Sequence, residues 1–187
     1  TLRAHVFGIP QDHNDLCGVL AQAIQSRATY ICIDPTAGLS LALTQRFDTR
    51  LDLWLDRSSL VRRVYQTPWD RIYRVVAPPG AFLAAYRSWA AGDDRRALQE
   101  CPDLPCAQAD LASTLLAAPT TRAQGEAMLL DLVRHYPVDT ASVLRLSEAW
   151  RQDGRVQDAV TLLSEAARVA QQEGRDTDAA RLVTASR

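Results

Sequence analysis

The spacing of apolar residues along the chain changes at Pro78-Pro79-Gly80. Before this point the apolar runs are short and rich in β-branched and aromatic residues, as in strands, whereas alanine and leucine recur at helical spacing after it. A Pro-Pro-Gly stretch interrupts both kinds of regular structure. The pattern therefore predicts a boundary there and two domains, at residues 1–79 and 80–187.

The first domain alternates between strand and helix patterns. Strands are expected at Leu2–Phe7, Tyr30–Ile33 and Arg71–Val76. Helices are expected from Asn14 or Asp15 to Ile24, over Leu39–Gln45, and from Arg50 to Tyr65. Because alternation of strands and helices is typical of an α/β layer, we predict a partly parallel sheet in this domain.

The second domain has a helical pattern throughout, broken by glycine and proline. The expected helices are Ala81–Ala91, Asp94–Glu100, Ala107–Ala118, Thr121–Tyr136, Thr140–Asp153, Val156–Gln172 and Asp176–Thr184. Because the connections between them are short, consecutive helices are expected to lie antiparallel.

The helical region also contains an internal repeat. Small and apolar residues recur at a shift of 34 residues, which pairs Gly125 with Ala159, Leu129 with Leu163, and Leu132 with Ala166. This shift is the period of a tetratricopeptide repeat, and Val143–Gln171 resembles one full unit of it. We therefore predict an all-α, tetratricopeptide-like helical array. A generic antiparallel bundle gives a similar periodicity and is the alternative.

The charge of the chain limits its functional classes. The 187 residues include 21 basic residues, all of them arginine, and 22 acidic ones, for a net charge of −1. This balance argues against a strongly basic nucleic-acid binder, and the absence of lysine excludes catalysis that depends on lysine. No apolar run has the length of a membrane span, and the first residues lack a signal-peptide pattern. These features predict a cytoplasmic protein with no membrane partner.

Few side chains are arranged for catalysis or metal binding. Cys101 and Cys106 have the spacing of some metal sites, but no second pair of ligands accompanies them, so a proline-rich turn is favoured. His13 and Cys17 have a spacing that brings a base and a nucleophile together only on a helix. We therefore predict no enzymatic activity, no metal and no cofactor.

The run Tyr30-Ile31-Cys32-Ile33-Asp34-Pro35 is a short apolar strand that ends in an acidic residue and proline. It resembles the second strand of the ParA/MinD partition ATPases. This resemblance implies a nucleotide-binding-like layer, in which Asp34 either binds a magnesium ion or cofactor or caps the following turn. The phosphate-loop position, Gly8–Asp15, lacks lysine and carries acidic residues, so we expect an inactive pseudo-ATPase region.

A second resemblance covers Leu132–Glu173, through His135-Tyr136-Pro137, Ala149-Trp150 and Asp153-Gly154-Arg155. This segment resembles the bacterial transcriptional activator domain, a helical module that follows a winged helix and mediates dimerisation or contact with the transcription machinery. The likeness implies that Ser58–Val76 ends a winged helix, with a recognition helix over Leu60–Tyr65 and a wing strand over Arg71–Val76. The arginines implied as phosphate contacts are Arg57, Arg62, Arg63, Arg71 and Arg74.

Taken together, these patterns predict a non-enzymatic regulatory or scaffold protein. Its helical repeats are expected to bind a protein partner, a second copy of the chain included. The alternative is a DNA-binding transcriptional regulator with a bacterial transcriptional activator domain. The candidate partner-binding residues are Trp69, which stands between proline and aspartate, and the consecutive arginines Arg62 and Arg63.

Overall fold

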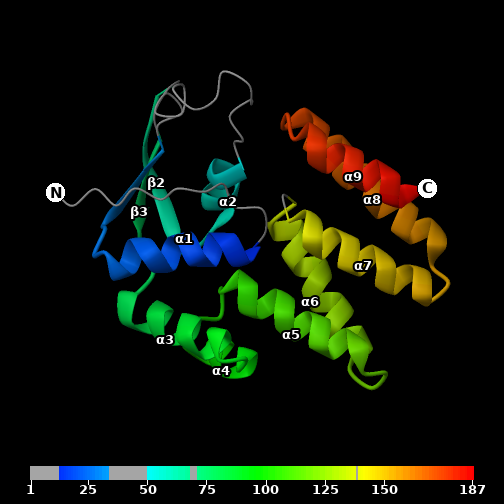
Figure 1. Cartoon of the computed structure of the whole chain (residues 1–187), viewed down its shortest axis with the longest axis horizontal. Coiled ribbons are helices and arrows are strands. Elements are labelled where there is room, and N and C mark those ends of the chain that lie inside the picture. The colour runs from blue at the N-terminus through cyan, green and yellow to red at the C-terminus, as the bar shows by residue number, and fades with distance from the viewer. Residues whose placement is uncertain (1–12, 34–49, 68–70, 138) are drawn as a thin grey trace. The chain divides into compact units, whose positions relative to one another are not determined.

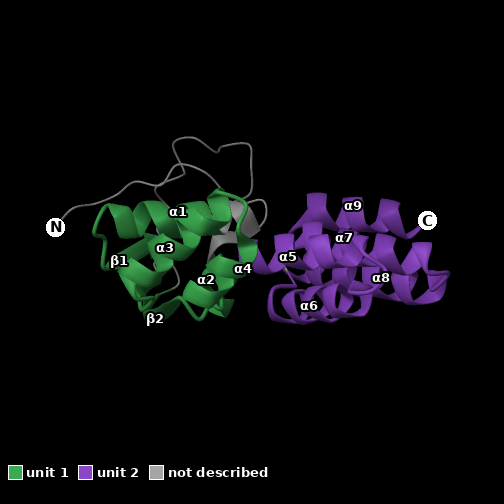
Figure 2. Cartoon of the chain, turned by 90° about the horizontal axis from the view of Figure 1, so that it is seen from below, with its two compact units in different colours: residues 1–104 green, residues 105–187 purple. Residues whose placement is uncertain are grey.

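The structure of the chain is a computed structural model. It describes residues 13–33, 50–67, 71–137 and 139–187. Figure 1 follows the chain through these elements, and Figure 2 colours its two compact units, residues 1–104 and 105–187.

The division between the units falls after α4 (Asp94–Glu100), whereas the predicted boundary falls before α3 (Pro79–Ala90). The reason is that α3 packs against α1 (His13–Gln25) and α4 packs against α3. The first helical pair therefore belongs to the same unit as the sheet. The Pro78-Pro79 stretch ends a strand and begins a helix, with Pro79 at the first position of α3, where proline is well tolerated.

The described sheet has three strands, β1 (Tyr30–Ile33), β2 (Val61–Gln66) and β3 (Arg71–Val75). Their order is β1-β3-β2, and both neighbouring pairs are antiparallel. The predicted partly parallel sheet is therefore wrong for these strands. The connection between β2 and β3 is too short for the crossover that parallel strands require, so the two strands form a hairpin. The expected strand Leu2–Phe7 lies outside the described residues.

The sequence predictions for the sheet region are otherwise mixed. The expected strands Tyr30–Ile33 and Arg71–Val76 are confirmed, the second ending at Val75. The expected helix from Arg50 to Tyr65 is wrong in its second half, because α2 ends at Arg57 and β2 follows it. The same finding corrects the implied recognition helix over Leu60–Tyr65. This segment is a strand because valine, tyrosine and arginine pair along β3.

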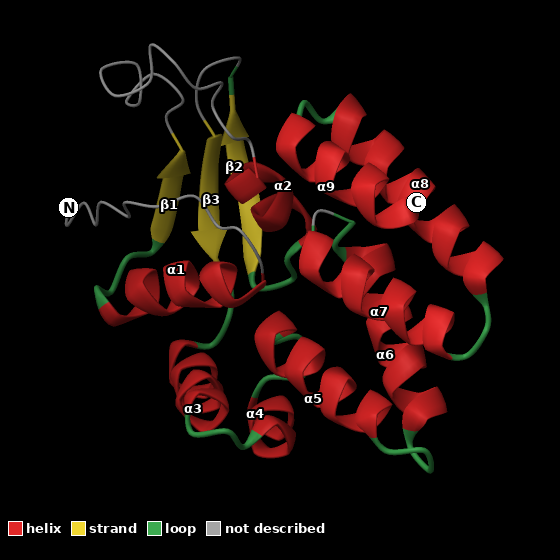
Figure 3. Cartoon of the chain, turned by 45° about the vertical axis from the view of Figure 1, so that its right-hand side comes forward, coloured by secondary structure: helices red, strands yellow, loops and turns green. Residues whose placement is uncertain are grey.

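One face of the sheet belongs to the core of the first unit, and Figure 3 shows α2 lying beside β2. Tyr73 of β3 is fully buried, and its hydroxyl donates to a carboxylate oxygen of Asp56 at 2.9 Å. Trp54 of α2 and Leu20 of α1 are also fully buried. Trp54 is thus a core residue of the first unit.

The second unit is made entirely of helices in its described residues. They are α5 (Pro105–Ala117), α6 (Arg122–His135), α7 (Thr140–Gln152), α8 (Val156–Gln172) and α9 (Asp176–Ser186). The main packing is between neighbours in sequence, α5 with α6, α7 with α8, and α8 with α9. The predicted succession of helices is confirmed in this unit, and α8 has the expected bounds, whereas the likeness to a tetratricopeptide repeat stays a prediction.

The positions that recur at the 34-residue shift are buried. Gly125, Leu129 and Leu132 of α6 are buried, as are Ala159 and Leu163 of α8. At Gly125 the backbones of α5 and α6 approach so closely that an added Cβ would lie 2.6 Å from a carbonyl oxygen of α5. The repeat in the sequence therefore reflects close helix packing. None of the helices in the described part of the chain is both long and apolar enough to cross a membrane.

Candidate functional site

The exposed face of the sheet carries a row of side chains that lie side by side. Tyr30, Arg74 and Arg62 are register partners across β1, β3 and β2. All three are exposed, Tyr30 by 52%. Because side chains alternate between the two faces of a strand, the neighbours Val61 and Tyr73 point to the buried face. We call the row Tyr30–Arg74–Arg62 the arginine row.

The two arginines of this row have no acidic partner among the residues that the structure describes. Neither Arg62 nor Arg74 forms an ion pair or a side-chain hydrogen bond with any residue that the structure describes. The adjacent Arg63 differs, because it points to the other face and its guanidinium binds both carboxylate oxygens of Asp56, at 2.7 and 2.8 Å. Like charges directly opposite each other destabilise a strand pair. An anion placed between Arg62 and Arg74 would relieve this repulsion.

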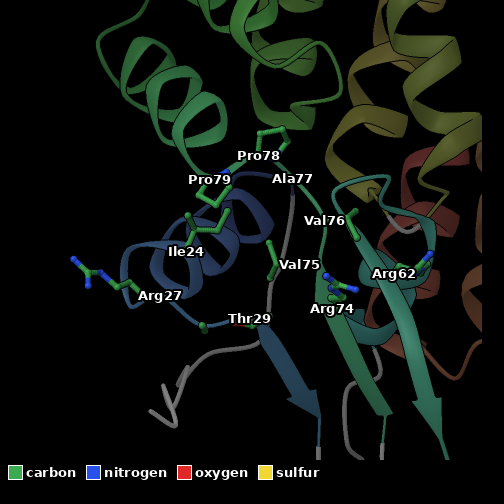
Figure 4. Close-up of a pocket in the computed structure, with 11 residues that line it drawn as sticks. Ile24, Arg27, Thr29, Arg62, Arg74, Val75, Val76, Ala77, Pro78 and Pro79 are labelled. Atoms are coloured by element: carbon green, nitrogen blue, oxygen red, sulfur yellow. The ribbon is translucent and has the colours of Figure 1, made fainter. Parts of the chain in front are cut away.

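A cavity of about 640 Å³ adjoins the arginine row (Figure 4). It is lined by Ile24, Arg27, Ala28, Thr29, Arg62, Arg74 and residues 75–79. In the view of Figure 4, Arg62 and Arg74 lie at one side of the cavity, on neighbouring strands, and Arg27 lies at the other. The cavity thus combines an apolar lining with two guanidinium groups that have no acidic partner in the described chain.

The end of α1 brings Arg27 to the cavity in an unusual backbone conformation. The amide of Ala28 donates to the carbonyl of Ala23, and the amide of Arg27 to that of Ile24, both at 2.9 Å. This pattern ends a helix with one residue in the left-handed region, usually glycine. Here that residue is Arg27, with φ of 55°. Its backbone is therefore strained, and its side chain lies at the rim of the cavity.

The structure describes some of the predicted site residues and not others. Arg62 lies on the exposed face and lines the cavity, whereas Arg63 is held in an ion pair with Asp56. Asp34 and Trp69 lie outside the described residues, so their predicted roles stay predictions. Sequence reasoning missed Arg27, because its place at the cavity depends on residues distant in sequence, such as Val75 and Pro79. The alternation of β2 and β3, once they are known to be strands, identifies Arg62 and Arg74.

A second concave surface lies within the helical unit. This groove of about 440 Å³ is lined by Leu130, Val133, Arg134, Pro137, Val143, Trp150, Asp158, Thr161, Leu162, Glu165, Ala166 and Val169. These residues come from α6, α7, α8 and the connection after α6. The lining is mainly apolar, with acidic side chains of α8 among it. We call it the helical groove.

A polar cluster fixes the helices beside this groove. The Trp150 indole nitrogen donates to a carboxylate oxygen of Glu126 at 2.7 Å, and the Arg155 guanidinium lies 4.6 Å from the centre of the Trp150 ring. Arg155 also binds Glu126 and Asp158. The hydrogen bonds that Arg155 donates to Glu126 and to Asp158, the first having the larger effect, raise the pKa of Arg155 above its ordinary value. This cluster is satisfied internally and serves the packing of α6, α7 and α8.

In the described ranges, no three His, Cys, Asp or Glu side chains are placed to hold a metal ion. The cysteines Cys17, Cys32, Cys101 and Cys106 are all free thiols, and all but Cys32 are buried. The side chain of His13 lies outside the described residues. The chemistry that the described residues offer is therefore positive charge and apolar surface.

Comparison with family models, with curated proteins and with solved structures found no match. The proposed function therefore rests on three features of the structure: the arginine row, the cavity and the helical groove.

Proposed function

We propose that this chain is a DNA-binding regulatory protein in which the first unit contacts DNA and the helical unit binds a protein partner. The observation that carries the proposal is the order of elements in the first unit. A helix and strand (α1, β1) precede a helix and a hairpin (α2, β2, β3), and the sheet order is β1-β3-β2 with antiparallel pairing. This arrangement supports the winged-helix resemblance. It gives no support to a parallel, nucleotide-hydrolysing layer.

The β2–β3 hairpin takes the place of the wing in this proposal. The candidate for the recognition helix moves from Leu60–Tyr65 to α2, which directly precedes the hairpin. Arg62 and Arg74 stand on the exposed face of the hairpin without an acidic partner in the described chain. Exposed arginines of this kind bind phosphate oxygens and position a protein on the duplex. The net charge of −1 does not exclude this role, because four of the 21 arginines lie on the hairpin strands, at positions 62, 63, 71 and 74.

The experiment is fluorescence anisotropy of the full chain with labelled duplex fragments at low salt, followed by a salt titration. Wild-type protein is expected to bind at micromolar concentration. The double variant Arg62→Gln/Arg74→Gln should reduce the slope of log affinity against log salt by roughly 2, because each phosphate contact contributes about 1. Arg95→Gln is the matched control, since Arg95 is an exposed arginine of the same unit. No binding at low salt overturns the proposal, as does equal loss in the control.

The second candidate is a scaffold that binds only protein. The helical groove favours it, because an apolar surface between packed helices suits a partner helix or a second copy of the chain. Analytical ultracentrifugation of the chain alone distinguishes this candidate. Self-association that is lost in Leu162→Glu, together with no DNA binding, supports the scaffold. Ser164→Glu is the control, because Ser164 is an exposed residue of α8 outside the groove lining, and it should self-associate like wild type. A monomer at all concentrations removes self-association as the function of this groove.

A further inference from the structure

The cavity beside the arginine row has the properties of a small-molecule site. Its volume of about 640 Å³ lies within the range of ligand pockets, roughly 300 to 1,000 Å³. Ile24, Val75 and Pro79 supply apolar surface between the two charged sides, as Figure 4 shows. A phosphate ion alone would fill a small part of this volume. A ligand that fits it has both an anionic group and an apolar body.

We infer that the cavity binds a small phosphate ester of nucleotide size. The phosphate is placed at Arg62 and Arg74, whose strands are hydrogen-bonded neighbours and whose positions are directly opposite. Guanidinium groups bind phosphate oxygens through paired N–H donors. The apolar or aromatic body of the ligand lies against Ile24 and Val75. Thr29, at the start of β1, adds a hydroxyl to the lining.

Two features of the structure agree with this assignment. Arg62 and Arg74 repel each other across the strand pair, and a bound anion removes that repulsion. Arg27 occupies a left-handed position that glycine would fill without strain. Strained residues of this kind cluster at binding sites. Figure 4 shows the Arg27 side chain extending outward, so its contribution is positive potential at the rim.

The site also regulates the proposed function, and this consequence rests on DNA binding by the hairpin. The same two guanidinium groups cannot bind a ligand phosphate and a DNA phosphate together. Occupation of the cavity therefore releases DNA. Binding of the small ligand itself needs no DNA.

The test is isothermal titration calorimetry of the full chain with ADP, adenosine and pyrophosphate at low salt. ADP is expected to bind at least about tenfold more tightly than either fragment, because it alone offers both phosphate and an aromatic body. Arg62→Gln and Arg74→Gln should each lower the affinity for ADP by about 10-fold or more, the effect of losing a charged hydrogen bond. Arg95→Gln should leave it unchanged.

Three results overturn the inference. They are no binding of ADP at millimolar concentration, equal affinity for ADP and pyrophosphate, and wild-type affinity in both arginine variants. Circular dichroism of each variant confirms that it is folded. In a separate arm, ADP is added to the complex with labelled DNA; release of DNA supports the regulatory consequence, and retention of both ligands overturns that consequence alone. If the chain binds ADP but no DNA, the proposed function is wrong and the ligand site is still supported.

Discussion

The arginines of the sheet and those of the helical unit differ in what surrounds them. In the helical unit, Arg122 binds Asp153 at 2.9 Å and Arg175 binds both Glu173 and Asp178, at 2.8 and 2.9 Å. On the sheet, Arg62 and Arg74 have no acidic partner among the residues described. The residue type is the same in both regions. Arg122 and Arg175 are paired with acids of the helical unit, whereas Arg62 and Arg74 have no such partner within the described ranges.

Two turns of the helical unit show how far sequence alone can separate these roles. Asp153-Gly154-Arg155 precedes α8 and Glu173-Gly174-Arg175 precedes α9, and in each the arginine binds the aspartate three residues later, at 2.9 Å. Yet the Arg155 side chain is 41% exposed and that of Arg175 is 1% exposed. The same local pattern thus gives a surface ion pair at one turn and a buried one at the other. Burial decides which arginine the fold depends on.

The largest expected effect is at Arg175. Arg175→Ala should destabilise the protein by about 3–5 kcal/mol, because it leaves two carboxylates beside a buried site without their counter-charge. Urea unfolding followed by far-ultraviolet circular dichroism measures this loss. Arg155→Ala is the matched control and should cost much less, since its ion pairs are exposed. Equal losses at the two turns would contradict the role assigned to burial.

The next effect concerns the close packing of α5 and α6. Gly125→Ala should cost about 1–3 kcal/mol, because the new methyl group would overlap the carbonyl of Ala112 and the amide of Leu116. Gly80→Ala, in α3, is the control, since a Cβ there meets nothing within 4 Å. The control should be neutral or slightly stabilising. Thermal unfolding of the two variants compares them, and an unperturbed Gly125→Ala protein would count against the close approach.

A smaller effect of opposite sign is expected at the end of α1. Arg27→Gly should stabilise the first unit by about 0.5–1 kcal/mol, because glycine adopts a positive φ without the steric cost that arginine bears. The same change removes one positive charge from the rim of the cavity. Denaturant unfolding measures the gain. A loss of stability would show that the Arg27 side chain contributes to folding.

The smallest effect on stability is expected on the sheet itself. Arg62→Gln and Arg74→Gln should each change the free energy of unfolding by no more than about 0.5 kcal/mol, with any change toward stabilisation. Neither side chain forms a hydrogen bond or an ion pair with a residue in the described ranges. Chemical denaturation checks this. A loss of more than about 1 kcal/mol would show that these arginines stabilise the fold, as Arg175 is expected to do. The two regions would then not differ in the role of their arginines.

The sequence predicted the helices well because their signals are local. Asp139 precedes α7, and its carboxylate accepts from the amide of Ser142 at 3.2 Å; Asp93 caps α4 in the same way through Arg96. Glycines with positive φ, such as Gly154 and Gly174, end the preceding helices. Caps, glycines and helical spacing can all be identified within one turn of chain.

The amino-acid sequence by itself determined the helical array, its breaks and the buried positions that repeat along it. Tertiary structure decided that Val61–Gln66 is a strand, because only pairing with Arg71–Val75 makes the extended form better than a continued helix. It also decided which arginines are buried, which are paired with acids and which face outward without such a partner in the described chain. Those properties depend on groups distant in sequence, because the energy of a charge is set by the groups and the solvent that surround it.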